Sequence, residues 1–114
     1  MVNDSDEPID ELDEVFHALA HSARRGMLAR LAERELTIGE LAEPLNMSLV
    51  AASKHVRVLE RAGLVGRTVR GRTHVCRLNP KPLAEADLWL RFYRRYWTES
   101  LDALEQLFTN EEDQ

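Results

Sequence analysis

Hydrophobic residues recur at helical spacing in the first third of the chain. From Asp10 onward they follow the 3.6-residue period, which predicts a first helix. Its apolar positions are Leu12, Val15, Phe16, Leu19 and Ala20. The segment HSARR interrupts this period, and Ser22 is a suitable N-cap for a second helix. That second helix is expected to turn Met27, Leu28 and Leu31 inward.

The segment TIGE, from Thr37 to Glu40, matches a capping box and predicts the start of a short third helix. Its apolar face consists of Ile38, Leu41, Ala42 and Leu45. A three-residue turn, NMS, follows, and its last residue, Ser48, is expected to cap a fourth helix. That helix should end where Gly63 can adopt the left-handed conformation.

Two short runs with β character follow, at residues 64–70 and 73–79, and the intervening Gly71-Arg72 predicts a hairpin turn. The segment NPKP is expected to exclude both strand and helix. A long last helix is predicted from about Leu83 to Phe108. The chain therefore divides into an acidic, disordered arm at 1–9, one domain at 10–109 and a tail at 110–114.

The order of these elements indicates a mainly α fold with a small β-hairpin. The third helix, the turn and the fourth helix form a helix-turn-helix, and the hairpin directly after them is its wing. The predicted fold is therefore a winged helix-turn-helix of the order α-α-α-α-β-β-α.

The distribution of charge along the chain indicates a function as well as a fold. The whole chain is formally −5, yet residues 48–77 hold seven Lys/Arg residues and one acid. A basic surface confined to one segment attracts a polyanion there and orients it. No apolar run approaches the ~20 residues that cross a bilayer, so a membrane is not an expected partner. An N-terminus without a signal sequence and a single cysteine favour the cytoplasm.

The fourth helix has a core stripe on one side and a small, then cationic, face on the other. Small residues let a helix backbone approach base edges in the major groove, and cations further along hold phosphates. Arg72 at the hairpin tip is the candidate wing contact, to phosphate or to the minor groove. The candidate DNA-binding residues are Ser48, Leu49, Val50, Ser53, Lys54, His55, Arg57, Arg61, Arg70 and Arg72.

The segments FHALAHSARRGMLARL and LTIGELAEPLNMSLVAASKHVRVLERAGLV, with the wing, resemble the ArsR/SmtB family of bacterial winged-helix repressors. The strongest marks are Ser53, His55, Leu59 and AGLV in the fourth helix, together with ALAHSARR. The resemblance implies a homodimer with the first and last helices at its interface and an operator of two inverted half-sites. The family often has Gln where this chain has Leu49, so its base preference is not carried over.

The family's metal sensing is not carried over either. Its best-known sensors place cysteines in the third helix, where TIGELAEPL has none, and the last helix lacks the histidine of the other familiar site. His17 and His21 are four residues apart and could face one metal ion if further ligands came from elsewhere. The simpler interpretation is an exposed His17 and a His21 suited to the turn. No metal and no other cofactor is therefore expected.

His74 and Cys76 alternate along the second wing strand and share a face that continues to Leu78. This pattern favours a small, buried cysteine. The alternative is a redox sensor, which requires an exposed and activated thiol.

The last helix carries two adjacent apolar stripes, one of which can pack on the chain's own core. The other needs a partner, because so much exposed aromatic area favours association. The predicted dimer-interface residues are Leu12, Phe16, Trp89, Phe92, Tyr93, Tyr96, Trp97, Leu101 and Leu104. An apolar effector between such aromatics is conceivable, and its identity is left open.

The sequence shows no catalytic constellation: it has no phosphate loop, no cysteine cluster and no acid–base pair. We therefore expect a binding protein and not an enzyme, with double-stranded DNA as its partner. The main hypothesis is a homodimeric repressor that binds an inverted-repeat operator. Two alternatives stay open: a winged-helix protein-interaction module, and a metal-responsive repressor that uses His17 and His21.

Overall fold

The computed structural model describes residues 10–112, so the acidic arm at 1–9 and the last two residues of the tail lie outside the described residues. The chain falls into two compact units, one up to Leu83 and one from Ala84 onward. Each unit is described by itself.

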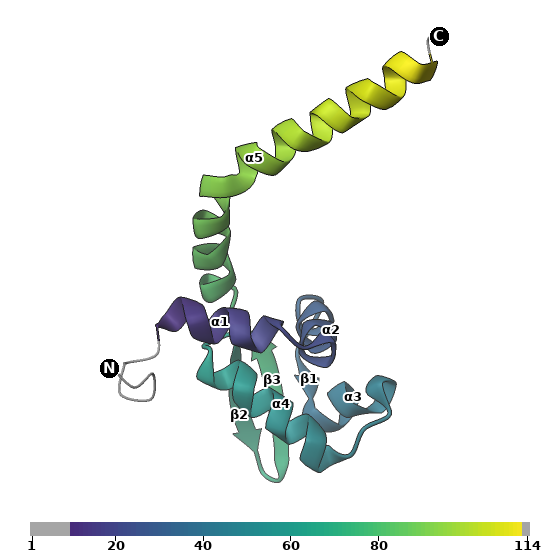
Figure 1. Cartoon of the computed structure of the whole chain (residues 1–114). Coiled ribbons are helices and arrows are strands. Elements are labelled where there is room, and N and C mark those ends of the chain that lie inside the picture. The colour runs from purple at the N-terminus through teal and green to yellow at the C-terminus, as the bar shows by residue number, and fades with distance from the viewer. Residues whose placement is uncertain (1–9, 113–114) are drawn as a thin grey trace, which may run out of the picture. The chain divides into compact units, whose positions relative to one another are not determined.

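The first unit contains the expected helices and strands in the expected order (Figure 1). They are α1 (Glu11–Leu19), α2 (Ser22–Leu31), β1 (Leu36–Thr37), α3 (Ile38–Ala42), the 3-10 turn η2 (Glu43–Leu45), α4 (Leu49–Arg61), β2 (Val65–Arg70) and β3 (Thr73–Leu78). Helix α5 (Lys81–Glu112) starts in this unit and forms the second. The predicted winged helix-turn-helix is confirmed.

Side-chain caps explain where α1 and α3 begin. Asp10 accepts a hydrogen bond from the Leu12 amide at the start of α1. At α3 the capping box is complete, since Thr37 Oγ1 accepts from the Glu40 amide and Glu40 Oε1 accepts from the Thr37 amide at 2.9 Å. The hydrogen bond from the Thr37 backbone to its carboxylate lowers the pKa of Glu40.

The cap of α2 differs from the prediction by one residue. Ser22 is the first helical residue, and His21 is the N-cap, with its Nδ1 accepting from the Ala23 amide at 3.2 Å. The unprotonated ring nitrogen accepts a hydrogen bond from a first-turn amide that has no partner within the helix, as a serine hydroxyl would. The prediction that Ser22 is the N-cap was therefore wrong.

The helix-turn-helix and the wing both depend on residues with positive φ. Asn46, with φ 52°, reverses the chain after η2, and Gly63, with φ 76°, ends α4. Gly71, with φ 65°, forms the hairpin turn before Arg72. Asparagine and glycine adopt this conformation at low cost, which is why these turns were readable from the sequence.

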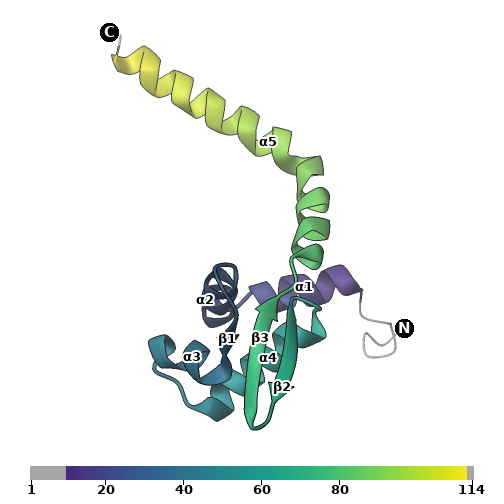
Figure 2. The ribbon, with the colours of Figure 1, turned by 180° about the vertical axis from the view of Figure 1, so that it is seen from behind.

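The wing belongs to a three-stranded antiparallel sheet in which β3 lies between β1 and β2 (Figure 2). Strand β1 pairs Leu36 with Cys76 and Thr37 with Val75. This two-residue strand was not predicted, because its length gives no alternating pattern. It attaches the start of α3 to the base of the wing.

The core lies between the helices and the inner face of this sheet. The predicted inward residues Met27, Leu28 and Leu31 are buried. On α4, Ala52, Val56 and Leu59 are buried as well. The buried apolar residues that pack together are Ala18, Met27, Leu28, Leu31, Leu36, Ile38, Leu41, Ala42, Ala52, Val56, Leu59, Leu64, Val65 and Cys76.

One charged side chain, Arg24 on α2, is buried with this core, at 8% exposure. Its Nε donates to the Ala18 carbonyl oxygen at 2.7 Å and its Nη2 to the His17 carbonyl oxygen at 3.0 Å. These carbonyls belong to the last turn of α1, where no further amides are available and where a cation is favoured. The guanidinium thus supplies the hydrogen-bond donors that a further turn of α1 would have supplied, and it connects α1 to α2.

Helix α5 is longer than predicted at both ends. It begins at Lys81 because Pro82 lies in its first turn, where a proline has no helical hydrogen bond to lose, so NPKP does not exclude a helix. It ends at Glu112, so most of the predicted tail is helical.

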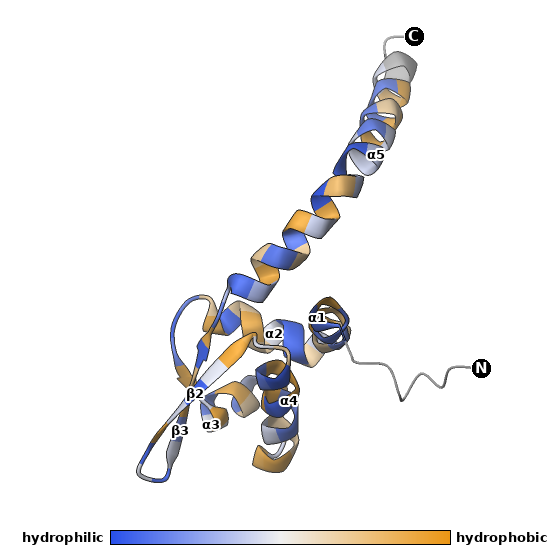
Figure 3. Cartoon of the chain, turned by 90° about the vertical axis from the view of Figure 1, so that its left-hand side faces the viewer, coloured by the Kyte–Doolittle hydropathy of each residue, from blue (hydrophilic) through white to orange (hydrophobic). Residues whose placement is uncertain are grey.

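Polar and apolar residues alternate along α5 (Figure 3). Within residues 10–112, neither α5 nor any other helix combines the length and the apolar character that a membrane crossing requires.

Replacing Arg24 with Ala should destabilise the fold by about 2–4 kcal/mol, because two carbonyls lose a charged donor inside the core. Urea unfolding followed by circular dichroism measures this loss. Arg25→Ala is the matched control, since the exposed Arg25 donates only to the Leu19 carbonyl oxygen at 2.8 Å and should cost less than about 1 kcal/mol. Equal losses in the two variants would contradict the role given to Arg24.

Candidate nucleic-acid interface

The N-terminus of α4 is built by the turn before it. Asn46 reverses the chain, and Ser48 caps the helix by accepting the Ala51 amide on its Oγ at 3.1 Å. The cap was predicted, and it fixes where the exposed Leu49 and Val50 stand. Their side chains are 61% and 67% exposed, unusually high for apolar residues at a helix start. An N-terminus with short exposed side chains is able to approach base edges closely.

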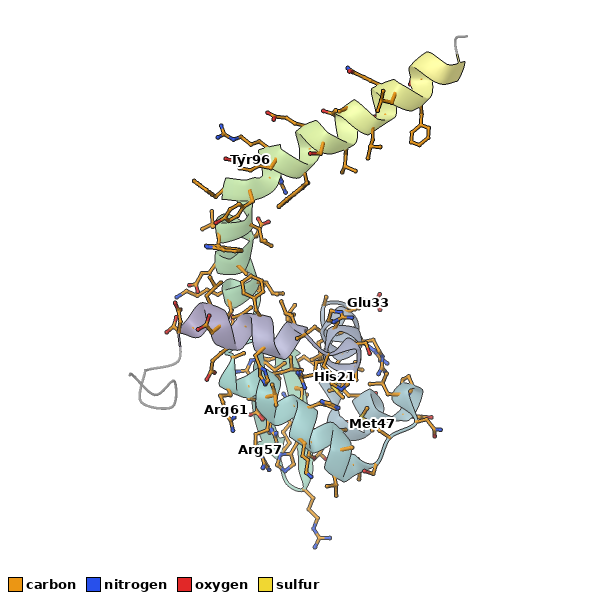
Figure 4. The ribbon with its side chains drawn as sticks, viewed as in Figure 1. His21, Glu33, Met47, Arg57, Arg61 and Tyr96 are labelled. Atoms are coloured by element: carbon orange, nitrogen blue, oxygen red, sulfur yellow. The ribbon has the colours of Figure 1, made fainter. Side chains whose placement is uncertain are left out.

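The side chains along the rest of α4 point to different sides of the helix. Ala52, Val56 and Leu59 enter the core. The opposite side carries Lys54, Arg57 and Arg61, all exposed and without an ion pair within residues 10–112. Figure 4 shows Arg57 and Arg61 projecting from the same edge of the helix.

A hollow of about 490 Å³ brings the start of α4 together with the tip of the wing. Leu49 and Ser53 line it from α4, and Arg72 lines it from the hairpin. The other lining residues are Thr37, Ile38, Gly39, Thr73 and His74. Three of the predicted DNA-binding residues, from two segments more than eighteen residues apart, therefore share one surface.

This hollow adds three residues that the sequence did not single out for DNA. Thr37 and Thr73 carry hydroxyl groups, and His74 carries an imidazole, so each can donate to a phosphate oxygen. They were missed because their proximity to α4 depends on the pairing of β1 with β3, a contact without a local signal.

A polar network holds the wing against α4. Arg67 on β2 forms an ion pair with Glu60 on α4, and its Nη1 lies 3.1 Å from His74 Nδ1 on β3. Since a guanidinium only donates, His74 Nδ1 is the acceptor. Arg67 Nε is buried without a hydrogen-bond partner.

Two of the seven bases in segment 48–77 therefore serve the fold. Arg67 belongs to this network, and Arg77 donates to Thr68 Oγ1 across the hairpin at 2.9 Å. Arg70 and Arg72 remain exposed near the turn. The wing keeps two cations for a ligand and uses two to set its own geometry.

The predicted DNA contact His55 points to the other flank of α4. Its Nδ1 lies 3.3 Å from Arg24 Nη1, and its ring centroid lies 4.6 Å from that of His21. Burial, followed by the charges of His21 and Arg24, lowers the pKa of His55. The imidazole thus faces the junction of α1 and α2 and positions the helix.

The two histidines of the metal hypothesis do not gain further ligands in the described structure. Residues 10–112 contain no group of three His, Cys, Asp or Glu side chains that could hold a metal ion. His21 Nδ1 is occupied as the cap of α2, and its ring packs on His55.

The single cysteine is fully buried, as its alternation with His74 and Leu78 predicted. Cys76 has 0% exposure and pairs with Leu36 across the sheet. Burial raises the pKa of its thiol, which opposes formation of the reactive thiolate.

Helix α5 and α1 carry the residues predicted for a dimer interface. On α5 all seven are exposed in the single chain, from 40% for Tyr93 to 71% for Phe92, while Leu12 and Phe16 on α1 are half-buried. Tyr93 lies within ring-stacking distance of Trp89, Phe92 and Tyr96. The rings of Trp89, Phe92, Tyr93 and Tyr96 thus form one cluster. This cluster and the other three predicted residues of α5 are together called the aromatic surface of α5.

A capped helix with an exposed basic side, joined through a shared hollow to a basic wing, defines a winged helix-turn-helix DNA-binding domain. Comparison with known proteins agrees with this class, since the sequence model of a helix-turn-helix domain family matches residues 19–67.

The HTH-type transcriptional regulator Rv2034 of Mycobacterium tuberculosis is 39% identical over 101 residues, which cover 89% of this chain and 92% of that protein. The transcriptional repressor SdpR of Bacillus subtilis is 28% identical, covering 69% of this chain and 88% of that protein. The crystal structure of the ArsR family transcriptional regulator RHA00566 superposes with a TM-score of 0.71 at 33% identity, covering 77% of this chain and 91% of that one. The chain belongs to the ArsR family of winged helix-turn-helix, DNA-binding transcriptional regulators.

The burial of Cys76 leads to a direct test. A maleimide should leave the native protein unlabelled at neutral pH, because the reagent cannot reach a fully buried thiol of raised pKa. Mass spectrometry should show complete labelling after addition of denaturant. Thr73→Cys, at an exposed position of the same strand, is the control and should label rapidly. Fast native labelling at Cys76 would revive the redox alternative.

Proposed function

We propose that the protein is a homodimeric, sequence-specific transcriptional repressor that acts by binding and not by catalysis. The observation that carries this proposal is the hollow that unites Leu49 and Ser53 of α4 with Arg72 of the wing. Beside it, Lys54, Arg57 and Arg61 form an exposed basic edge without ion pairs in the described part of the chain. We also propose that the protein acts in the cytoplasm, where it would meet DNA.

We infer that different side chains contact different parts of the DNA. The α4 N-terminus enters the major groove, where Ser53 and Lys54 hydrogen-bond base edges and Leu49 and Val50 contact thymine methyl groups. The sugar-phosphate backbone passes over the hollow between α4 and the wing, within reach of Arg72. Since this set contains few bidentate donors, phosphate contacts and DNA shape contribute much of the selectivity.

The dimer supplies the symmetry of the operator. The aromatic surface of α5 exposes more contiguous apolar area than is usual for a helix that faces only solvent. A second copy of the same chain would cover it with the same surface, in an isologous interface. Two α4 helices related by this symmetry would enter successive major grooves about 34 Å, or ~10 bp, apart. A dimer bound in this way would occlude a promoter, as expected of a repressor; the relative SdpR carries that name.

Lys54→Ala and Arg57→Ala should each weaken binding to DNA and lower the slope of log affinity against log salt by about one, since each lost cation at the DNA surface releases one fewer counterion. Fluorescence anisotropy at several salt concentrations, with a labelled duplex from the region upstream of the protein's own gene, measures both effects. Arg34→Ala is the control, because Arg34 lies beside Glu40 at 3.9 Å and at the far end of α2.

An unchanged salt slope in both variants would remove Lys54 and Arg57 from the interface. Absence of wild-type binding to any duplex, including genomic fragments in a selection, would favour the protein-interaction module.

Leu101→Glu should dissociate the dimer, because it places a charge within the aromatic surface of α5. Analytical ultracentrifugation should give twice the mass of one chain for the wild type and the mass of one chain for this variant. Gln106→Glu adds the same charge on the polar side of α5, away from the predicted stripes, and should remain dimeric. A monomeric wild type would contradict the symmetric arrangement.

A further inference from the structure

Two histidines meet where α1, α2 and α4 join. The rings of His21 and His55 have centroids 4.6 Å apart and are inclined by 56°. Arg24 lies beside them, with Nη1 3.3 Å from His55 Nδ1. Through Arg24, which also holds the carbonyl oxygens of His17 and Ala18, the DNA-binding helix is connected to both neighbouring helices. His21 is shown at this junction in Figure 4.

Both contacts require an unprotonated Nδ1. The Ala23 amide donates to His21 Nδ1, and the Arg24 guanidinium, which has no acceptor, donates to His55 Nδ1. Protonation turns each Nδ1 into a donor, so both hydrogen bonds are lost. It also adds positive charge beside a buried guanidinium that stays charged at every relevant pH.

Among the ion pairs of residues 10–112, none brings a carboxylate to His21 or His55. Besides Arg24, the other charged or titratable side chains on α1 to α4 and η2 are Glu11, Asp13, Glu14, His17, Arg25, Arg30, Glu40, Glu43, Lys54, Arg57, Glu60 and Arg61. Glu33, Arg34 and Glu35 follow the end of α2. Within residues 10–112 no ion pair joins either imidazole to any of the acids.

The acids nearest in the fold are directed elsewhere. Asp13 and Glu14 line a separate hollow of about 290 Å³ with His17, Val58 and Arg61. On α3, Glu40 is held by its own cap, and on α4, Glu60 pairs with Arg67 on the side of the wing.

We propose that the His21–His55 pair is an acid-sensitive contact that loosens α4 from α1 and α2, so that the protein releases DNA on acidification. This proposal rests on the proposed function, since it is the DNA-binding helix that is released. The proton is the effector, and the junction is its binding site.

The direction of the pH dependence follows from linkage. The fold lowers the pKa of His55, so the unfolded chain binds this proton more readily than the folded chain. The contribution to stability is complete above the ordinary histidine pKa of about 6.5 and decreases as the pH falls below it. Carboxylates titrate mostly below about pH 5 and do not produce this change.

The predicted fall in affinity is opposite to the simple electrostatic expectation. A histidine at a DNA surface attracts phosphate more strongly when it is protonated, so affinity would rise on acidification. Weaker binding at low pH therefore reports a change in the domain, whereas stronger binding reports a histidine in direct contact with DNA.

The test is the double variant His21→Asn/His55→Asn. An asparagine oxygen stands near the position of Nδ1, accepts the same hydrogen bonds, suits an N-cap and does not titrate. Thermal unfolding and anisotropy with the labelled upstream duplex are measured at about pH 7.5 and about pH 5.5. The single variant His17→Asn is the matched control, because His17 is exposed and meets Arg24 through its backbone carbonyl oxygen.

For the wild type we expect DNA affinity to fall about tenfold between these pH values, as for one proton taken up on release. Its unfolding temperature should fall as well. The double variant should lose both dependences, and the His17→Asn control should keep them.

A wild type whose affinity and unfolding temperature are the same at both pH values would overturn the proposal. It would also be overturned by a double variant that keeps the wild-type dependence, or by loss of the dependence in the His17→Asn control. If the double variant does not fold, NMR titration of the wild-type histidines decides, since a His55 that titrates at or above the ordinary value contradicts the mechanism. The unfolding measurements need no DNA, so they test this contact even if the duplex is not bound and the proposed function fails.

Discussion

The buried guanidinium of Arg24 is the contact on which the arrangement of the DNA-binding helix depends. It satisfies the last carbonyls of α1 from within α2 and reaches His55 on α4 with its remaining nitrogen. A lysine would provide a single point charge there, whereas the planar fork of arginine serves three acceptors at fixed angles. This one side chain thus joins α1, α2 and α4 through hydrogen bonds.

Helix α4 is then fixed on three sides and free on the fourth. The core holds it through Ala52, Val56 and Leu59, Arg24 holds it through His55, and the wing holds it through the pair of Glu60 with Arg67. Each of these contacts uses a different side of the helix, and among the described residues the side with Lys54, Arg57 and Arg61 stays exposed. A rigid helix with one available side is the physical requirement for placing several side chains against base edges at once.

The sequence predicted those features whose signals are local. The capping box at Thr37, the cap at Ser48 and the turns at Gly63 and Gly71 each depend on a few adjacent residues, and all four are confirmed. The contacts of His55 with Arg24 and of Arg67 with Glu60 join residues from different elements, and nothing in the residue types distinguishes such partners from exposed ones. His55 was therefore predicted to face DNA, although the spacing that placed Lys54 and Arg57 on the outer side was sound. The assignment of the DNA contacts and of the dimer interface remains a prediction.

The distribution of charge gains a physical meaning from these contacts. A chain of net charge −5 is expected, on average, to repel a polyanion such as DNA. The five bases left over after Arg67 and Arg77 are used internally all lie on the outer edge of α4 or on the wing. With a screening length of about 8 Å at physiological ionic strength, a phosphate at that edge responds to these cations and only weakly to distant acids. The acidic remainder then disfavours every other orientation of DNA, so net repulsion and local attraction act together to select one face.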